Sequence, residues 1–208
     1  MKFNKIIDIS VDLNKKTVVY PGTPEMVIEE TKSTATGSQL SKITFSSHIG
    51  THIDAPLHAI AGGISLDQIN LEKFIGTCRV VDMQSSKPSI STEDVKKTNP
   101  QKGERILFKT SNSERGLETF YEDFVFLSPE AASHLATSEV SLVGIDYFSI
   151  KQKGSTDNRP HTELLAKNIP IVEGINLKDV EPGEYFLIAL PLKFIGTDGS
   201  PARVVLLQ

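Results

Sequence analysis

An alternation of apolar and polar residues, typical of β-strands, is the clearest pattern along this chain. Between residues 43 and 53 one side of the alternation carries mostly Ile, Phe and Thr, and the other carries His48, Gly50, His52 and Asp54. Shorter runs rich in Val, Ile, Leu and Phe, several bounded by Gly or Pro, predict further strands. These strands are expected at residues 78–83, 105–109, 140–145, 169–172, 185–190 and 203–207.

Three segments carry signals for the start of a helix. Ser128 is suited to be an N-cap, with a proline at the first helical position and an acid in the first turn, and this helix should run to about residue 137. A shorter helix is expected to open at Ser91, and a third to cover residues 162–167 after Pro160. No repeat or linker divides the chain. The elements predict one mixed α/β domain over residues 1–208, with sheet as its main component.

Composition and charge narrow the functional classes. The chain has 208 residues, 38% of them hydrophobic, and a formal charge of −4, which argues against a nucleic-acid partner. No apolar stretch is long enough for a signal peptide or a membrane span, so no membrane partner is expected. The single cysteine, Cys78, lies in a predicted strand and is interpreted as a packed residue. We therefore expect a cytoplasmic protein.

Three of the five histidines fall within eleven residues, together with a carboxylate: His48, His52, Asp54 and His58. Histidine is the commonest metal ligand, and burying several imidazoles with a carboxylate would be costly without an ion. An ideal strand would separate His48 from His52 by roughly 13 Å, so the segment should bend at Gly50 to bring them together. The alternative is that each histidine is structural.

The segment His48 to His58 matches, residue for residue, the pattern His-x-Gly-Thr-His-x-Asp-x-Pro-x-His. It resembles the signature of the cyclase-like metal-dependent hydrolase family, which includes the bacterial kynurenine formamidases (arylformamidases). The likeness extends over nearly the whole chain, through the segments 20–24, 127–132, 142–146 and 196–203. It implies an α/β fold with a mixed, curved, barrel-like sheet flanked by helices, and a homodimer or homotetramer.

The resemblance also implies a site with two divalent metal ions, zinc or alternatively manganese. His48, His52 and Asp54 would hold one ion, and Asp54 would bridge to a second held by His161 and Glu173. From the residues alone, His161 is expected at a helix start and Glu173 at a strand end, where sites in α/β folds often gather. The remaining site residues would be His58 as general acid/base and Tyr20 in the substrate pocket.

The chemistry implied by the resemblance is hydrolysis of N-formyl-kynurenine to kynurenine and formate. A metal-bound hydroxide would attack the formyl carbonyl, with His58 moving the proton. Alternatives are a hydrolase of a cyclic amide such as isatin, of an ester or of a lactone, and a metal-binding protein without catalysis. A serine hydrolase is disfavoured because the chain has no Gly-x-Ser-x-Gly segment.

Two positions depart from the family pattern near the expected substrate pocket. Tyr20 stands where kynurenine formamidases usually have Trp, and Lys151 stands where many relatives have an acid. Asp198 and Arg203, in the C-terminal motif, are interpreted as a structural ion pair between a turn and the start of a strand.

Overall fold

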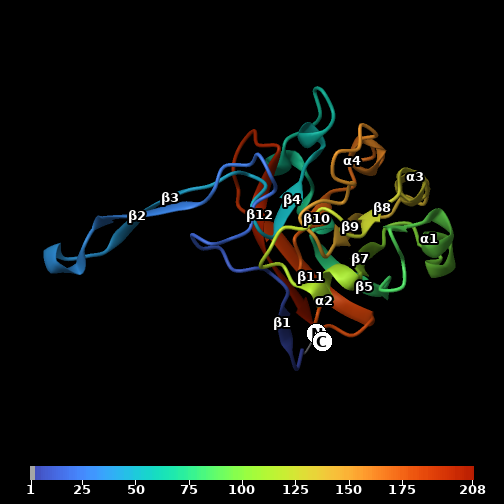
Figure 1. The fold of residues 1–208 in the computed structure, drawn as a ribbon, viewed down its shortest axis with the longest axis horizontal. Helices are drawn as coiled ribbons and strands as arrows, with labels where there is room; N and C mark the ends of the chain where they lie inside the picture. The colour runs from blue at the N-terminus through green and yellow to red at the C-terminus, as the bar shows by residue number, and fades with distance from the viewer. Residues whose placement is uncertain (1–2) are drawn as a thin grey trace.

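A computed structural model describes residues 3–208 as a closed, mostly buried β-sheet with helices packed along one side (Figure 1). Eight strands form the main sheet in the order β1-β12-β11-β5-β7-β9-β10-β4, and β4 also pairs with β12. That extra pairing closes seven of the strands into a barrel and leaves β1 outside the ring. The strands of this sheet are β1 (Ile6–Asp8), β4 (His52–Asp54), β5 (Ile75–Asp82), β7 (Arg105–Lys109), β9 (Leu142–Ile145), β10 (Ile171–Glu173), β11 (Gly183–Pro191) and β12 (Gly199–Leu207).

The barrel is a mixed sheet, as expected. Four adjacent strands, β5, β7, β9 and β10, run parallel to one another. Strand β4 is antiparallel to both β10 and β12. Side chains alternate between two cores: Leu107 joins the core inside the barrel, whereas Ile106 and Phe108 join a core beneath the helices. The strands of the parallel part are therefore covered on both faces, which explains their continuous apolar sequence.

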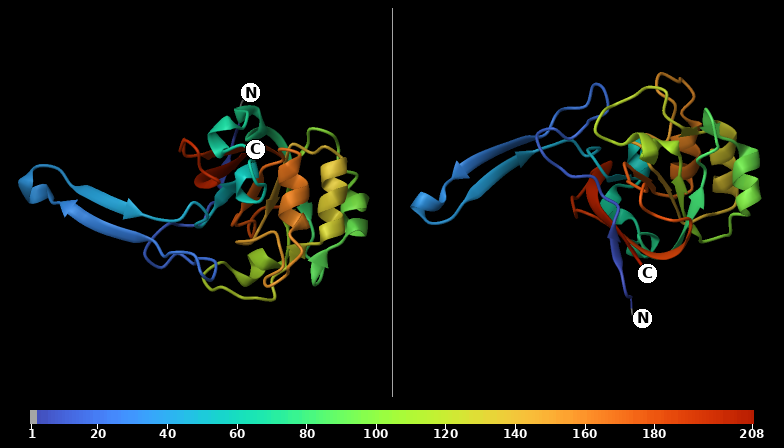
Figure 2. Two further views of the ribbon diagram at one scale, coloured as in Figure 1. Left: turned by 90° about the horizontal axis from the view of Figure 1, so that it is seen from above. Right: turned by 60° about the horizontal axis from the view of Figure 1, so that its bottom comes forward.

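The helices α1 (Thr92–Thr98), α3 (Pro129–Thr137) and α4 (Arg159–Ala166) lie side by side along one face of the sheet (Figure 2). Ser128 caps α3 (Pro129–Thr137) through the amide of Ala131, as predicted. Ser91 likewise caps the shorter predicted helix, in a capping box with Asp94. The third helix starts earlier than predicted because Pro160 is tolerated in its first turn. The α-helices are α1 (Thr92–Thr98), α2 (Ser111–Arg115), α3 (Pro129–Thr137) and α4 (Arg159–Ala166); the short 3-10 helices include η2 (Pro56–His58), η3 (Leu66–Gln68) and η4 (Leu71–Lys73).

The predicted single strand over residues 43–53 was wrong in its extent. Strand β3 (Leu40–Thr44) ends before it and pairs with β2 (Val27–Lys32) in a separate two-stranded arm that projects from the body (Figures 1 and 2). The chain then turns through Gly50, whose φ is +57°, and enters the barrel as β4. The alternating pattern therefore covers two strands in two different sheets.

The other strand predictions agree with the barrel to within a few residues at their ends. The remaining small sheet joins β6 (Ser89–Ile90) and β8 (Phe126–Leu127), which sequence patterns did not indicate. Cys78 lies buried in β5, as expected of a packed residue. Among residues 3–208, no helix has the length and apolar character needed to cross a membrane.

Candidate metal centre and its pocket

The candidate site is built around β4, the short strand that closes the barrel. His52 lies opposite Glu173 of β10 on one side and opposite Pro201 of β12 on the other. The bend that precedes it needs a glycine at position 50, because a Cβ there would lie 2.5 Å from Leu13 Cδ2 and φ is positive. The predicted bend at Gly50 is confirmed.

Four side chains from three elements converge beneath this strand. His52 Nε2 lies 3.4 Å from Glu173 Oε2 and 3.5 Å from Asp54 Oδ1. His161, from the first half of α4, places its Nε2 3.4 Å from Glu173 Oε1 and 3.8 Å from Asp54 Oδ2. All four side chains are buried. The sequence prediction that His161 and Glu173 join this cluster from distant parts of the chain agrees with the geometry.

The spacing of these atoms fits a metal ion better than a hydrogen-bonded network. Ligand atoms about 2.0–2.2 Å from an ion in a tetrahedral shell lie about 3.3–3.6 Å from one another. Asp54 Oδ2 is buried and has no hydrogen-bond partner among the described residues, and the same is true of His161 Nδ1. A buried carboxylate oxygen without a partner is costly, so the donor set is suited to a divalent cation.

Local hydrogen bonds orient these side chains. His52 Nδ1 donates to the carbonyl oxygen of Gly50 at 2.9 Å, which leaves Nε2 as the nitrogen with a free lone pair facing the cluster. Glu173 Oε1 accepts from the backbone N–H of Ile150 at 2.6 Å, which fixes the carboxylate at the end of β10. The cluster is therefore positioned by backbone groups of the bend and of the loop after β9.

Both buried carboxylates remain ionised. Burial acts to raise the pKa of Asp54, but the hydrogen bond from His48 and the nearby imidazoles outweigh burial and hold that pKa below its usual value. For Glu173, burial and the charge of Asp54 act to raise the pKa, yet the neighbouring imidazoles of His161 and His52 lower it. Two adjacent anions with imidazole nitrogens between them provide the charge that a divalent ion requires.

His48 lies beside this cluster and is hydrogen-bonded through both ring nitrogens. Nδ1 donates to Asp54 Oδ1 at 2.9 Å, and Nε2 donates to Asp198 Oδ2 at 2.8 Å. Although burial acts to lower it, the two carboxylates raise the pKa of His48 to about 9. Donor atoms of His48, Asp54 and His58 also lie within 4.8 Å of one another, and so do those of His52, Asp54 and Glu173. Asp54 therefore belongs to both groups, and His48 would bind a metal only after giving up a proton and one of these two hydrogen bonds.

His58 lies at the mouth of the site, on η2, with 31% of its side chain exposed. Its ring centroid is 4.1 Å from that of His48 and 5.4 Å from that of His161. Burial is the largest effect on the pKa of His58 and lowers it from 6.5. The result is an imidazole that is less deeply buried than the other histidines of the cluster and faces the cavity above it.

Sequence reasoning missed Asp198. The suggested pairing of Asp198 with Arg203 is wrong: Asp198 contacts His48, whereas Arg203 Nε donates to Asp8 Oδ2 at 2.7 Å. Asp198 follows the bend at Gly196 and Thr197, and its neighbour Gly199 passes so close to His48 that a Cβ would lie 2.8 Å from the ring. An acid beside glycines in the C-terminal motif was the available signal.

A cavity of about 280 Å³ opens above the cluster and has the size of a small aryl substrate. Tyr20 forms part of its wall, as predicted, and its ring meets Phe120 edge-on at 5.3 Å between centroids. The cavity is lined by Tyr20, Thr23, Ser46, His48, His52, His58, Phe148, Ser149, Lys151, Asn158, His161 and Glu173.

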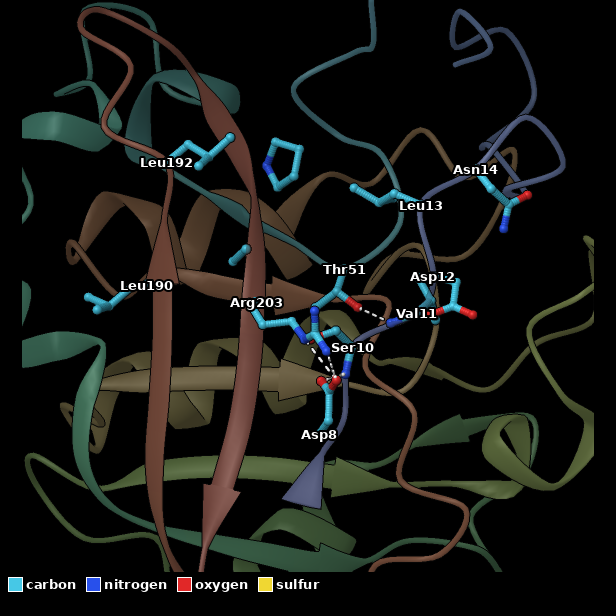
Figure 3. A pocket seen from close by; sticks show the side chains of 12 residues that line it. Asp8, Ser10, Val11, Asp12, Leu13, Asn14, Thr51, Leu190, Leu192 and Arg203 are labelled. Atoms are coloured by element: carbon cyan, nitrogen blue, oxygen red, sulfur yellow. Dashed lines mark hydrogen bonds and ion pairs between the residues drawn. The ribbon is translucent and has the colours of Figure 1, made fainter. Parts of the chain in front are cut away.

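A larger cavity, of about 680 Å³, lies elsewhere, between the N-terminal segment and the edge of β12 (Figure 3). The ion pair of Asp8 and Arg203 forms part of its wall, and Thr51 accepts a hydrogen bond from the amide of Val11 there. This cavity has no histidine in its lining. We therefore place the chemistry in the smaller cavity, where the candidate ligands converge.

The chain is similar to known proteins over nearly its whole length. Residues 7–152 match the family model "Cyclase", described as "Putative cyclase". The chain is 38% identical to a kynurenine formamidase of Salinibacter ruber over 204 residues, covering 97% of this chain and 96% of the relative. It is 34% identical to a kynurenine formamidase of Bacillus cytotoxicus over 208 residues, covering 99% of both chains.

A solved structure of similar sequence has a similar fold. It is described as a potential metal-dependent hydrolase with cyclase activity and superposes with a TM-score of 0.88 at 36% identity, covering 98% of this chain and 97% of the other. The expected barrel-like α/β fold is confirmed, and the buried His, Asp and Glu side chains are suited to the divalent metal that such an enzyme requires. The chain belongs to the cyclase family of metal-dependent hydrolases.

Proposed function

We propose that this chain hydrolyses the formamide bond of N-formyl-kynurenine to give kynurenine and formate. The observation that carries the proposal is the cluster of imidazoles and two buried carboxylates at the base of a cavity of about 280 Å³. The relatives from Salinibacter ruber and Bacillus cytotoxicus are both named kynurenine formamidase, which supports this substrate. We further propose a cytoplasmic location.

We propose two divalent ions, zinc in the first instance, with manganese as the alternative that carboxylate ligands allow. His52, Asp54 and Glu173 would hold one ion, with His161 close to the same carboxylates, and Asp54 would also reach a second ion beside His48. This grouping differs from the one expected from the sequence, which placed His52 with His48 on one ion and His161 with Glu173 on the other. When bound, the metal polarises the carbonyl oxygen and lowers the pKa of a water molecule. The partnerless oxygen of Asp54 is the feature that best supports the bridging role.

His58 is the proposed proton carrier. Its ring faces the cavity, and its Nδ1 lies 3.7 Å from Asp198 Oδ2, so a carboxylate is close enough to stabilise the imidazolium. His58 would take a proton from the attacking water and deliver it to the aryl amine as the C–N bond breaks. Because its donor atoms also lie near those of His48 and Asp54, the alternative role of His58 is as a ligand.

Tyr20 would provide one wall for the aromatic ring of the substrate. Its own ring is held edge-on by Phe120, and its half-buried hydroxyl has a pKa raised by burial, so it remains neutral. The rival substrate class is a cyclic amide such as isatin, which would place an aryl amide against the same wall.

The test compares hydrolysis of N-formyl-kynurenine and isatin by the metal-reconstituted protein and by His58→Asn. We expect faster hydrolysis of N-formyl-kynurenine, and a kcat lowered about 10²–10⁴-fold in His58→Asn with metal content unchanged. Loss of metal from this variant would instead make His58 a ligand. Preferential hydrolysis of isatin would refute the substrate assignment. His134→Asn, in a half-exposed position of α3, is the matched control.

A further inference from the structure

Lys151 is a cation in the lining of the candidate cavity, on the loop that joins β9 to α4. Its ammonium group donates one hydrogen bond, to the carbonyl oxygen of Ser155 at 3.2 Å. Within residues 3–208, no carboxylate lies within 4.0 Å of its Nζ. An ammonium group has three donors, so two remain for a ligand.

The other cations near Lys151, Lys153 in the same loop and Arg159 at the start of α4, are already paired. Lys153 Nζ lies 2.6 Å from Glu122 Oε1, outside the cavity lining. Arg159 donates to both oxygens of Asp157 and to Glu130 Oε1. Asp157, the next acid after Lys151 in the sequence, is therefore occupied by Arg159. Of the three cations at residues 151–159, two are paired with carboxylates, and Lys151 keeps its positive charge in the cavity lining.

The position of this charge fits one part of the proposed substrate. The formamide must reach the cluster at the base of the cavity, where the His and carboxylate groups converge. A half-buried ammonium beside that base would attract an anionic group elsewhere on the same molecule, through a charge-assisted hydrogen bond. N-formyl-kynurenine carries such a group, the carboxylate of its amino-acid part.

We propose that Lys151 binds the carboxylate of the substrate and makes this chain selective for formamides that carry an anionic group. This inference rests on the proposed function and assigns the selectivity to one residue. The lining also contains the polar side chains of Ser149 and Asn158 and the aromatic rings of Tyr20 and Phe148. A substrate with an aryl ring and a carboxylate would find partners for both groups in this lining.

The experiment compares two formamides that share the ring, the ketone and the formyl group. N-formyl-kynurenine carries the carboxylate, and 2-formamidoacetophenone lacks it. In Lys151→Met, which keeps the length of the side chain, we expect KM for N-formyl-kynurenine to rise about tenfold with kcat nearly unchanged. For 2-formamidoacetophenone, kcat/KM should remain within twofold of the unmodified protein. Lys151→Arg should recover most of the loss in KM.

Lys153→Met is the matched control, because it removes a paired lysine two residues away, and both substrates should be unaffected. An equal effect of Lys151→Met on the two formamides, or no effect on either, would overturn the inference. A binding measurement separates this failure from failure of the proposed function. If the unmodified protein hydrolyses neither formamide, the proposed function fails. The role of Lys151 would still be supported if Lys151→Met bound kynurenine more weakly than the unmodified protein does, with no change in its binding of 2-aminoacetophenone. Unchanged binding of kynurenine by Lys151→Met would refute that role.

Discussion

Replacing Glu173 by Gln tests whether the buried cluster is a metal site, because it removes one charge with almost no change in shape. Glu173 is 3% exposed, and its Oε1 accepts a hydrogen bond from the amide of Ile150, which a glutamine oxygen can still accept. The fold should therefore persist. What is lost is one of the anionic oxygens that lie 3.4 Å from His52 and His161.

The expected magnitude follows from linkage between binding and folding. At a metal concentration of 100 times Kd, binding stabilises the folded protein by about 2.7 kcal/mol, which for a chain of this size raises Tm by about 5–10 °C. Removing one member of a buried charged group costs about 3–5 kcal/mol, on the order of a thousandfold in affinity. At the same metal concentration the stabilisation of Glu173→Gln then falls below about 0.1 kcal/mol.

The assay is thermal unfolding of the chelated protein with and without added zinc, for the unmodified chain, for Glu173→Gln and for the control Glu184→Gln. Glu184 lies exposed on β11, away from the cluster, and its variant should keep the full rise in Tm. A rise of the same size in Glu173→Gln would refute the ligand role of this carboxylate. A large loss of Tm in the absence of zinc would instead show that Glu173 has a structural role.

Three further predictions concern other parts of the molecule. Asp198→Asn weakens the hydrogen bond that orients the His48 ring, so kcat/KM should fall about 10–100-fold while the fold stays intact. An unchanged kcat/KM would show that Asp198 has no role in the site. Burial raises the pKa of the Cys78 thiol to about 12, so alkylation by iodoacetamide at pH 8 should require unfolding, and rapid labelling of the folded protein would contradict this. We expect a homodimer or homotetramer with the β2–β3 arm in the contact, because an isolated hairpin is marginally stable in water and Ile43 is 51% exposed. Ile43→Lys should lower the mass measured by light scattering, whereas Leu71→Lys should not; equal masses would refute the role of the arm.

Local signals in the sequence were sufficient for most elements of the fold. Ser128 and Ser91 start their helices where predicted because a cap depends on neighbours within a few residues. The closure of the barrel could not be predicted from periodicity, since β4 pairs with two strands far along the chain. The arm was missed because its alternation continues into residues 45–53 without a clear break.

In the candidate site, too, local features could be predicted from the sequence and long-range contacts could not. The bend at Gly50 and the convergence of His52 with Asp54 follow from chemistry within a few residues. His161 and Glu173 required the family resemblance, because an isolated histidine and a strand-end acid carry no local signal. Asp198 lies 150 residues from the His48 ring that it contacts, and its role depends on a pairing of strands that only the fold provides.

Formate release from N-formyl-kynurenine, measured on the same protein before chelation, after chelation and after zinc is restored, shows whether hydrolysis depends on the bound metal. We expect hydrolysis by the metal-loaded protein, loss of hydrolysis on chelation, and recovery with zinc or manganese. Hydrolysis that persists in the fully chelated, folded protein would refute metal-dependent catalysis, and a metal-loaded, folded protein that releases no formate would refute the proposed reaction.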